Sequence, residues 1–273
     1  MTPQCWIDGI PTETLPATDR GLQYGDGLFE TLALRGGRIA LLDYHLDRLK
    51  EGCERLAMAM PGRDLLQREL ITAAAGQRNA ALKLMLTRGS GGRGYRPPTE
   101  AKPRRILLLH PWPDYPAEWA EQGIRLRLCR TRLAHQPQLA GIKHLNRLEQ
   151  VLARAEWNEA DGFQEGLMLD LDGAVVEGTM SNVFASPREG VLITPDLSRC
   201  GVAGVMRRHL LGSARSAGID VQVRALGLPE LQDCLEIFLS NSLMGVWPVA
   251  EFEGRRYTVG PMGRLARSWA EAA

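Results

Sequence analysis

The stretch GLMLDLDGAVVEGTMSNVFASPREGVLIT, residues 166–194, decides the fold class of this chain. Its apolar runs at 166–170 and 174–177 flank Asp172-Gly173, a dipeptide typical of a tight hairpin turn. Two further runs, 182–186 and 191–194, flank a second turn at 188–190. Consecutive antiparallel hairpins argue against a doubly wound parallel sheet, so we predict a β-rich domain here.

Strand and helix patterns alternate in the first third of the chain. The strand-like segments there are 29–34, 38–42, 81–87 and 104–110. Helical spacing of apolar residues predicts one helix that begins at Asp43, a plausible N-cap, and a second over 64–75. Together with the hairpins, these patterns indicate an α+β protein.

A proline-rich segment, 111–123, separates the two halves of the chain and is the best candidate for a linker. After it we expect a strand at 124–133, helices from Lys143 and near Val202, and strands at 221–224 and 236–239. The predicted organisation is an N-terminal α/β domain at 1–113, a linker at 114–123 and a C-terminal β-rich domain at 124–273.

Composition excludes several classes of protein. The 273 residues are 44% hydrophobic and 24% charged, as in a soluble globular protein. Lys+Arg (33) nearly equals Asp+Glu (32), which argues against a nucleic acid or an acidic membrane surface as partner. No apolar run is long enough to span a membrane, and the N-terminus shows no signal-peptide pattern. We therefore expect a cytoplasmic protein.

Cysteine and histidine spacing gives no sign of a metal or disulfide framework. The five cysteines have no close pair, and the five histidines form no cluster with ligand spacing. The pair Asp170 and Asp172 hints at a calcium loop, but no glutamate completes it. We expect no metal.

Only four lysines are available for amine chemistry: Lys50, Lys83, Lys102 and Lys143. Lys143 is the most unusual of them, because it lies where an extended loop meets a predicted helix start. The positive end of a helix disfavours a charged lysine, which helps to lower its pKa.

The segment 89–94 matches the G-x-G-x-x-G pattern of dinucleotide-binding proteins. The fingerprint requires an immediate helix, and Tyr95-Arg96-Pro97-Pro98 prevents one. Two interpretations remain, a mobile surface loop and a loop that binds an anion. Arg88, Arg93 and Arg96 suit a ligand with several carboxylates.

Several other residues have both a structural and a functional interpretation. Gly201–Gly204 is either an ordinary turn or a phosphate-binding helix start. Arg48 is either a solvated arginine or an anion ligand, Asn241 and Ser242 either cap a turn or line a site, and Glu177 ends a strand. A lysine, a carboxylate, an arginine and a phosphate-binding helix start are together what pyridoxal phosphate (PLP) requires.

Two motifs carry a family resemblance. KHLNRLEQ at 143–150 and EGTMSNVF at 177–184 resemble the class IV aminotransferase-like, fold type IV, PLP enzymes. YGDGLFET at 24–31 and NSLM at 241–244 are similar to the same family, and the likeness runs in order from about residue 5 to about residue 250. The resemblance implies two α+β domains, the second barrel-like, with the cofactor between them.

The resemblance also implies roles for individual residues. Lys143 would carry PLP and Glu177 would pair with its pyridine nitrogen. Contacts to the phosphate would come from Arg48, the amides of Val202 and Ala203, and Ser242, which stands where branched-chain aminotransferases have a threonine. The candidates for substrate binding are Tyr24, Thr31, Arg93, Tyr95 and Asn241. The family forms homodimers, in which loops of one subunit cover the site of the other.

Within the family, the residues after Lys143 and the loop RGSGGRGY at 88–95 are similar to enzymes that split 4-amino-4-deoxychorismate. The implied reaction is a carbon–oxygen lyase that yields p-aminobenzoate and pyruvate in folate biosynthesis. The alternatives are a D-amino-acid or branched-chain aminotransferase on the same scaffold, and a non-catalytic anion-binding protein.

Overall fold

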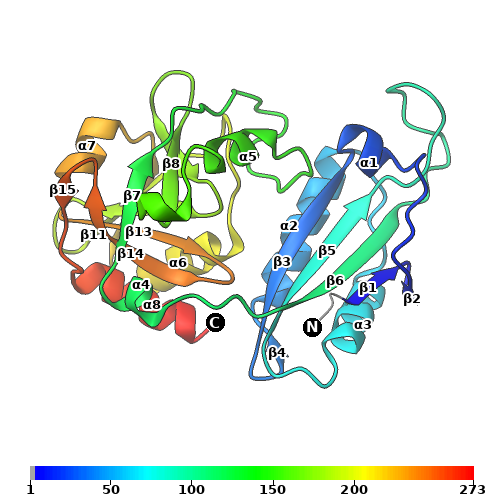
Figure 1. Cartoon of the computed structure of the whole chain (residues 1–273), viewed down its shortest axis with the longest axis horizontal. Helices are drawn as coiled ribbons and strands as arrows, with labels where there is room; N and C mark the ends of the chain where they lie inside the picture. Colours follow the sequence, from blue (N-terminus) through cyan, green and yellow to red (C-terminus); the bar gives the residue numbers. More distant parts are fainter. Residues whose placement is uncertain (1–3) are drawn as a thin grey trace. The chain divides into compact units, whose positions relative to one another are not determined.

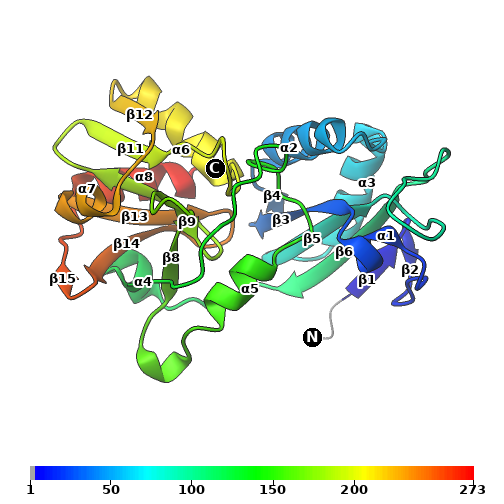
Figure 2. The ribbon, with the colours of Figure 1, turned by 90° about the horizontal axis from the view of Figure 1, so that it is seen from above.

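The structure, a computed structural model, describes residues 4–273. The chain forms two compact units (Figures 1 and 2), Met1–Asp114 with Ile142–Asn146, and Tyr115–Gly141 with Arg147–Ala273. Both units combine helices with a sheet, which confirms the predicted α+β class. The domain boundaries expected from the sequence remain a prediction. Residues 1–3 of the first predicted domain lie outside the described residues.

The first unit is a sheet with strand order β2-β1-β6-β5-β3-β4. Its strands are β1 (Gln4–Ile7), β2 (Ile10–Pro11), β3 (Gly27–Arg35), β4 (Arg38–Ile39), β5 (Ala80–Thr87) and β6 (Arg104–Pro111). Its helices are α1 (Arg20–Tyr24), α2 (Leu42–Arg55) and α3 (Arg63–Ala74). Helices α2 and α3 cover the same face of the sheet (Figure 2).

The first unit packs through the buried face of strand β3 and the buried stripe of helix α2. Alternate residues of β3, beginning with Leu28 and Glu30, are buried toward α2, while Phe29 and Thr31 on the other face are half-buried. The predicted stripe of α2 meets this face, with Leu46, Leu49 and Cys53 nearly inaccessible. The predicted N-cap is wrong, however, because α2 begins one residue before Asp43 and follows Leu41 in a left-handed conformation (φ 51°).

The second unit is built on a sheet that closes on itself. Its strand order is β12-β11-β10-β13-β14-β7-β8-β9, and an additional pairing of β9 with β10 completes a barrel-like ring. The strands are β7 (Ile124–Leu128), β8 (Glu165–Leu169), β9 (Val175–Gly178), β10 (Asn182–Ser186), β11 (Val191–Pro195), β12 (Asp220–Arg224), β13 (Glu236–Asn241), β14 (Gly245–Phe252) and β15 (Arg255–Arg256).

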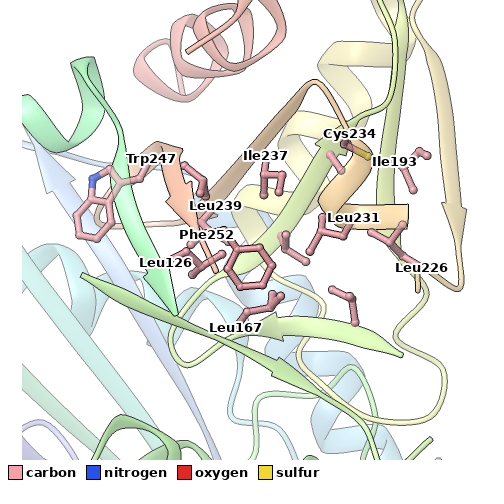
Figure 3. Packing of buried hydrophobic residues seen from close by; sticks show 14 of the residues in the cluster. Leu126, Leu167, Ile193, Leu226, Leu231, Cys234, Ile237, Leu239, Trp247 and Phe252 are labelled. Atoms are coloured by element: carbon pink, nitrogen blue, oxygen red, sulfur yellow. The ribbon is translucent and has the colours of Figure 1, made fainter. Parts of the chain in front are cut away.

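Helices surround this sheet and apolar side chains fill it. The helices are α4 (Ala117–Glu121), α5 (Leu148–Arg154), the 3₁₀ turn η1 (Glu159–Asp161), α6 (Val205–Ser216), α7 (Leu228–Asp233) and α8 (Pro261–Glu271). Figure 3 shows Leu126, Leu167, Leu239 and Phe252, from four different strands, pointing toward one another. Both hairpins predicted between 166 and 194 are confirmed, with β8 paired to β9 and β10 paired to β11.

The proline-rich segment after β6 is more ordered than its composition suggests. It contains α4, and the rings of Tyr115 and Trp119 lie 4.8 and 5.0 Å from the Trp247 ring in edge-on contacts. Edge-on aromatic pairs of this kind add to the burial of apolar area. Residues 115–123 therefore pack as part of the second unit. Among the described residues, no helix is long and apolar enough to cross a membrane.

Candidate active site

Lys143 lies in an extended segment that extends the sheet of the first unit beside β3. The Phe29 amide donates to the Lys143 carbonyl at 2.9 Å, and the Leu145 amide donates to the Gly27 carbonyl at 3.0 Å. The prediction that a helix begins at Lys143 is wrong, because this pairing keeps the backbone extended and α5 starts only at Leu148. The expectation that a helix N-terminus lowers the pKa of Lys143 is therefore wrong as well.

The pairing also fixes which way the Lys143 side chain points. His144 stands opposite Leu28 in an antiparallel bridge, so Lys143 shares a sheet face with Phe29. The Lys143 Nζ atom lies 4.4 Å from the centre of the Phe29 ring. Lys83 on β5 approaches the same ring, with its Nζ at 5.3 Å. Two of the four lysines therefore meet at one aromatic side chain.

The guanidinium of Arg48 is paired with a buried carboxylate rather than solvated. Its Nε donates to Glu30 Oε1 at 2.8 Å and its Nη2 donates to Glu30 Oε2. His45, three residues earlier on α2, lies with its Nδ1 2.6 Å from the same Oε2. Burial alone would raise the pKa of Glu30, but the Arg48 charge and these hydrogen bonds hold it at about 2.

Glu177 occupies a buried position on β9 in the second unit. Its Oε2 accepts from the Val202 amide at 2.8 Å, and its Oε1 accepts from Gln150 Nε2 at 3.4 Å. Gln150 Oε1 is a buried acceptor with no hydrogen-bond partner among the described residues.

The turn before α6 is tied to the segment that leads to Lys143. The Ala203 amide donates to the Gly141 carbonyl at 2.9 Å, and the Gly141 amide donates to the Gly201 carbonyl at 2.9 Å. The Val202 and Ala203 amides therefore already have protein acceptors, and a phosphate contact would require them to exchange these bonds. The predicted helix near Val202 begins instead at Val205, after Gly204.

Asn241 organises the turn between β13 and β14. Its Oδ1 accepts from the amides of Leu243 and Met244 at 2.9 and 2.8 Å. Its Nδ2 donates to the Met180 carbonyl at 3.1 Å, which joins this turn to the one after Glu177. The turn-capping interpretation of Asn241 thus describes its contacts here, and Ser242 lies in the turn that it caps.

The backbone of the loop at 88–95, here called the glycine-rich loop, is anchored by Arg20, which lies outside it. Arg20 donates to the carbonyls of Gly94 and Tyr95 at 3.0 and 2.9 Å and to Asp26 at 2.8 Å. The Tyr95 ring meets the Tyr24 ring at 5.4 Å, edge to face, yet Tyr95 is 84% exposed. Arg93 is also exposed. The backbone of the loop is therefore anchored by Arg20, while the side chains of Arg93 and Tyr95 are exposed.

Arg88 differs from the other arginines of this segment. It is buried, and it donates to Asp26 at 2.8 Å and to the Leu56 and Ala57 carbonyls at 2.8 and 3.0 Å. These contacts use its guanidinium to join β5 to the end of α2. Because its donors are used within the protein, these contacts argue against the prediction that Arg88 helps to bind a ligand.

Comparison with known proteins identifies the family. The model of the amino-transferase class IV family matches residues 27–252, most of the chain. The chain belongs to the class IV aminotransferases. This confirms the resemblance that was drawn from the lysine and glutamate motifs.

Members of this family resemble the chain over nearly its whole length. A protein from Vibrio harveyi named aminodeoxychorismate lyase is 37% identical over 96% of each chain. The crystal structure of 4-amino-4-deoxychorismate lyase from Pseudomonas aeruginosa is 51% identical, with a TM-score of 0.94 over 98% of each chain. A hypothetical aminotransferase from Mycobacterium tuberculosis, in a PLP-bound form, is 26% identical, with a TM-score of 0.84 over 99% of this chain and 98% of that one.

The predicted site residues of this class IV aminotransferase are held in place by residues that the sequence analysis does not single out. Glu30 binds Arg48, His45 contacts Glu30, and Phe29 lies under Lys143. Gln150 contacts Glu177. A signal for Glu30 was present, since a glutamate interrupts the apolar positions of β3, on the face that carries Leu28 and Leu32. For Phe29 and Gln150 the sequence offers no comparable signal.

Proposed function

We propose that this protein is a PLP-dependent lyase that converts 4-amino-4-deoxychorismate to p-aminobenzoate and pyruvate. The observation that carries the proposal is the 51% identity to the P. aeruginosa lyase over 98% of each chain. The Vibrio lyase, at 37% identity, points to the same reaction. Formation of p-aminobenzoate would place the enzyme in folate biosynthesis.

The chemistry of the donor set fits PLP. The cofactor needs an amine for its aldehyde, an acid for its pyridine nitrogen and cations for its phosphate. Lys143, Glu177 and Arg48 supply these groups, and each is fixed by neighbours of its own. Ser242 would add a hydroxyl to the phosphate site. The Val202 and Ala203 amides would join it after leaving Glu177 and Gly141.

Each of these residues has a definable task. When bound, PLP supplies an electron sink that stabilises negative charge on the carbon next to the substrate nitrogen. The Lys143 amine would take the proton from that carbon through Nζ, and the Phe29 ring would orient Nζ. Glu177 would pair with the pyridine nitrogen, and its negative charge would favour the protonated form of that nitrogen.

The glycine-rich loop offers two exposed arginines, Arg93 and Arg96, for a substrate with two carboxylates. Arg93 is exposed on a loop whose backbone Arg20 anchors, so its guanidinium can reach a carboxylate without reordering the loop. Tyr95 and Tyr24 would flank the substrate ring. Thr31, which shares the Phe29 face of β3, and Asn241 would complete the substrate contacts.

An aminotransferase is the second candidate function. The likeness to the hypothetical aminotransferase from M. tuberculosis favours it, because the same fold serves that protein. Both reactions would use the same lysine and glutamate, and they differ in whether a keto acid is needed. The exposed Arg93 and Arg96 favour the lyase, whose substrate carries two carboxylates, since a small aliphatic amino acid would call for fewer cations and a more apolar lining.

We propose a homodimer in the cytoplasm. Leu148, Val151 and Leu152 share one face of α5 and are 59–75% exposed, an apolar surface that a second copy could cover. All five cysteines are free thiols, as expected in a reducing compartment. Light scattering of the purified protein would measure the mass, and a monomer at micromolar concentration would reject the dimer.

The two enzymatic candidates are separated by a single-turnover test. The purified protein is mixed with D-alanine or a branched-chain amino acid, with no keto acid, and the cofactor form is followed by absorbance. The lyase proposal expects the aldehyde form to persist on the minute timescale. Rapid, complete conversion to the pyridoxamine form, with no pyruvate formed from aminodeoxychorismate, would favour the aminotransferase.

A further inference from the structure

Glu30 is a charged residue in an otherwise apolar position. It lies on β3 between Leu28 and Leu32, on the face that α2 covers, and it is 1% exposed. A buried carboxylate is costly unless it is paired and hydrogen-bonded, and an apolar side chain of similar size often serves stability equally well. Stability alone therefore gives no reason for a glutamate at this position.

The partners of Glu30 suggest what it does. Both of its oxygens accept from Arg48, one from Nε and the other from Nη2, so the carboxylate binds one edge of the planar guanidinium. A two-point contact of this kind fixes the plane of an arginine as well as its position. His45, one helical turn from Arg48, contacts the same carboxylate at 2.6 Å and restricts its rotation.

The pairing also restricts where Arg48 can act. Its side chain is only 10% exposed and spans from α2 to the sheet, so its stem cannot swing far. With one edge bound by Glu30, the guanidinium has a defined orientation before any ligand arrives. A preorganised cation binds an anion more tightly than a mobile one, because less side-chain freedom is lost on binding.

We propose that Glu30 is a positioning residue, which orients the Arg48 guanidinium for the phosphate group of the cofactor. This inference rests on the proposed function, in which Arg48 contacts that phosphate. Glu30 itself touches neither cofactor nor substrate. Its effect should therefore appear only with ligands that carry the phosphate.

The test compares PLP with pyridoxal, which has the same ring and aldehyde but no phosphate. Dissociation constants of both are measured by absorbance titration of the apoenzyme, for wild type and for Glu30→Gln. We expect Glu30→Gln to weaken PLP binding about tenfold and to change pyridoxal binding less than twofold. A general folding defect would weaken both ligands alike and would overturn the proposal.

Three further variants make the result specific. The quantity compared is the ratio of the pyridoxal dissociation constant to the PLP dissociation constant. Glu69→Gln removes the carboxylate of another ion pair in the same unit, with Arg105, and should leave this ratio unchanged. In an Arg48→Leu background, Glu30→Gln should have no further effect on the ratio. If Glu30→Gln does not fold, Glu30→Asp keeps the charge but withdraws it by one methylene, and it should lower the ratio as well.

Failure of this inference and failure of the phosphate assignment give different results. If Arg48→Leu lowers the ratio and both Glu30 variants leave it unchanged, Arg48 binds the phosphate without help and Glu30 has no positioning role. If Arg48→Leu itself leaves the ratio unchanged, the assignment of Arg48 to the phosphate is overturned, and the role of Glu30 with it.

Discussion

The Phe29 amide and the Lys143 carbonyl are joined by a 2.9 Å hydrogen bond, which places a loop lysine on the edge of a sheet 114 positions earlier in sequence. This backbone contact, together with the Phe29 ring under Nζ, positions both the backbone and the side chain of Lys143. Lys83 is the strictest comparison, because its Nζ approaches the same ring from β5.

Lys143 is therefore expected to be the lysine that carries the cofactor. Borohydride reduction of the holoenzyme, followed by peptide mapping, should place the pyridoxyl group on Lys143. Lys143→Ala should abolish the trapped product and turnover, whereas Lys83→Met should retain the trapped product. A pyridoxyl group on Lys83 would reassign the cofactor lysine.

Glu177→Gln should bind cofactor but turn over about 100-fold more slowly, comparable to the loss of one well-placed electrostatic contact. The amide is close in size, and its single oxygen can still accept from the Val202 amide, but it cannot stabilise a charged pyridinium. Steady-state kinetics with cofactor-saturated protein measure the effect. Glu189→Gln, at an exposed turn, is the matched control, and near wild-type turnover of Glu177→Gln would remove its assigned role.

Arg88 and Arg93 are five positions apart and should behave in opposite ways. Arg88→Met removes one of the two arginine donors to Asp26 and leaves the Leu56 and Ala57 carbonyls without the Arg88 donors, so we expect a loss of about 1–3 kcal/mol in the free energy of unfolding. Arg93→Met should leave stability unchanged and raise the KM of the substrate by about tenfold, as for one lost charged hydrogen bond. Thermal unfolding and kinetics of both variants check this. A stability loss in Arg93→Met with unchanged KM would refute the substrate contact.

Acid should destabilise the first unit through Glu30 and His45. Burial lowers the pKa of His45 below its usual 6.5, so below that pH the unfolded state binds a proton that the folded state does not. Glu30, with a pKa of about 2 against a usual 4.5, gives stability that is present above pH 4.5 and is lost as pH falls toward 2.

Denaturant unfolding between pH 8 and pH 3 measures this dependence. Wild type should lose stability progressively below about pH 6.5, and Glu30→Gln should lose less between pH 4.5 and pH 3 than wild type does. Equal slopes in that lower range would show that Glu30 does not titrate as the structure implies.

The sequence predicts the elements whose signals are local. The hairpins between 166 and 194 follow from apolar runs and turn dipeptides, and the stripe of α2 follows from helical spacing. The Lys143 segment shows where local signals fail. Its leucines have helical spacing, but pairing with β3 supplies hydrogen bonds that a helix start lacks, and no local pattern indicates a partner so distant in sequence.

The candidate site divides in the same way. Lys143, Glu177 and Arg48 were chosen for their chemistry and for the family resemblance. The residues that hold them depend on tertiary contacts, such as the carboxylate of Glu30 on Arg48 and the amide of Val202 on Glu177. Arg88 and Arg93 look alike in sequence, and only burial separates a structural arginine from an exposed one.

Product analysis with aminodeoxychorismate as the sole substrate decides whether the protein is a lyase. We expect p-aminobenzoate and pyruvate in equal amounts, over many turnovers, with no keto acid present and with the cofactor still in its aldehyde form at the end. The result that would contradict it is the absence of pyruvate and p-aminobenzoate from cofactor-saturated, folded protein under these conditions.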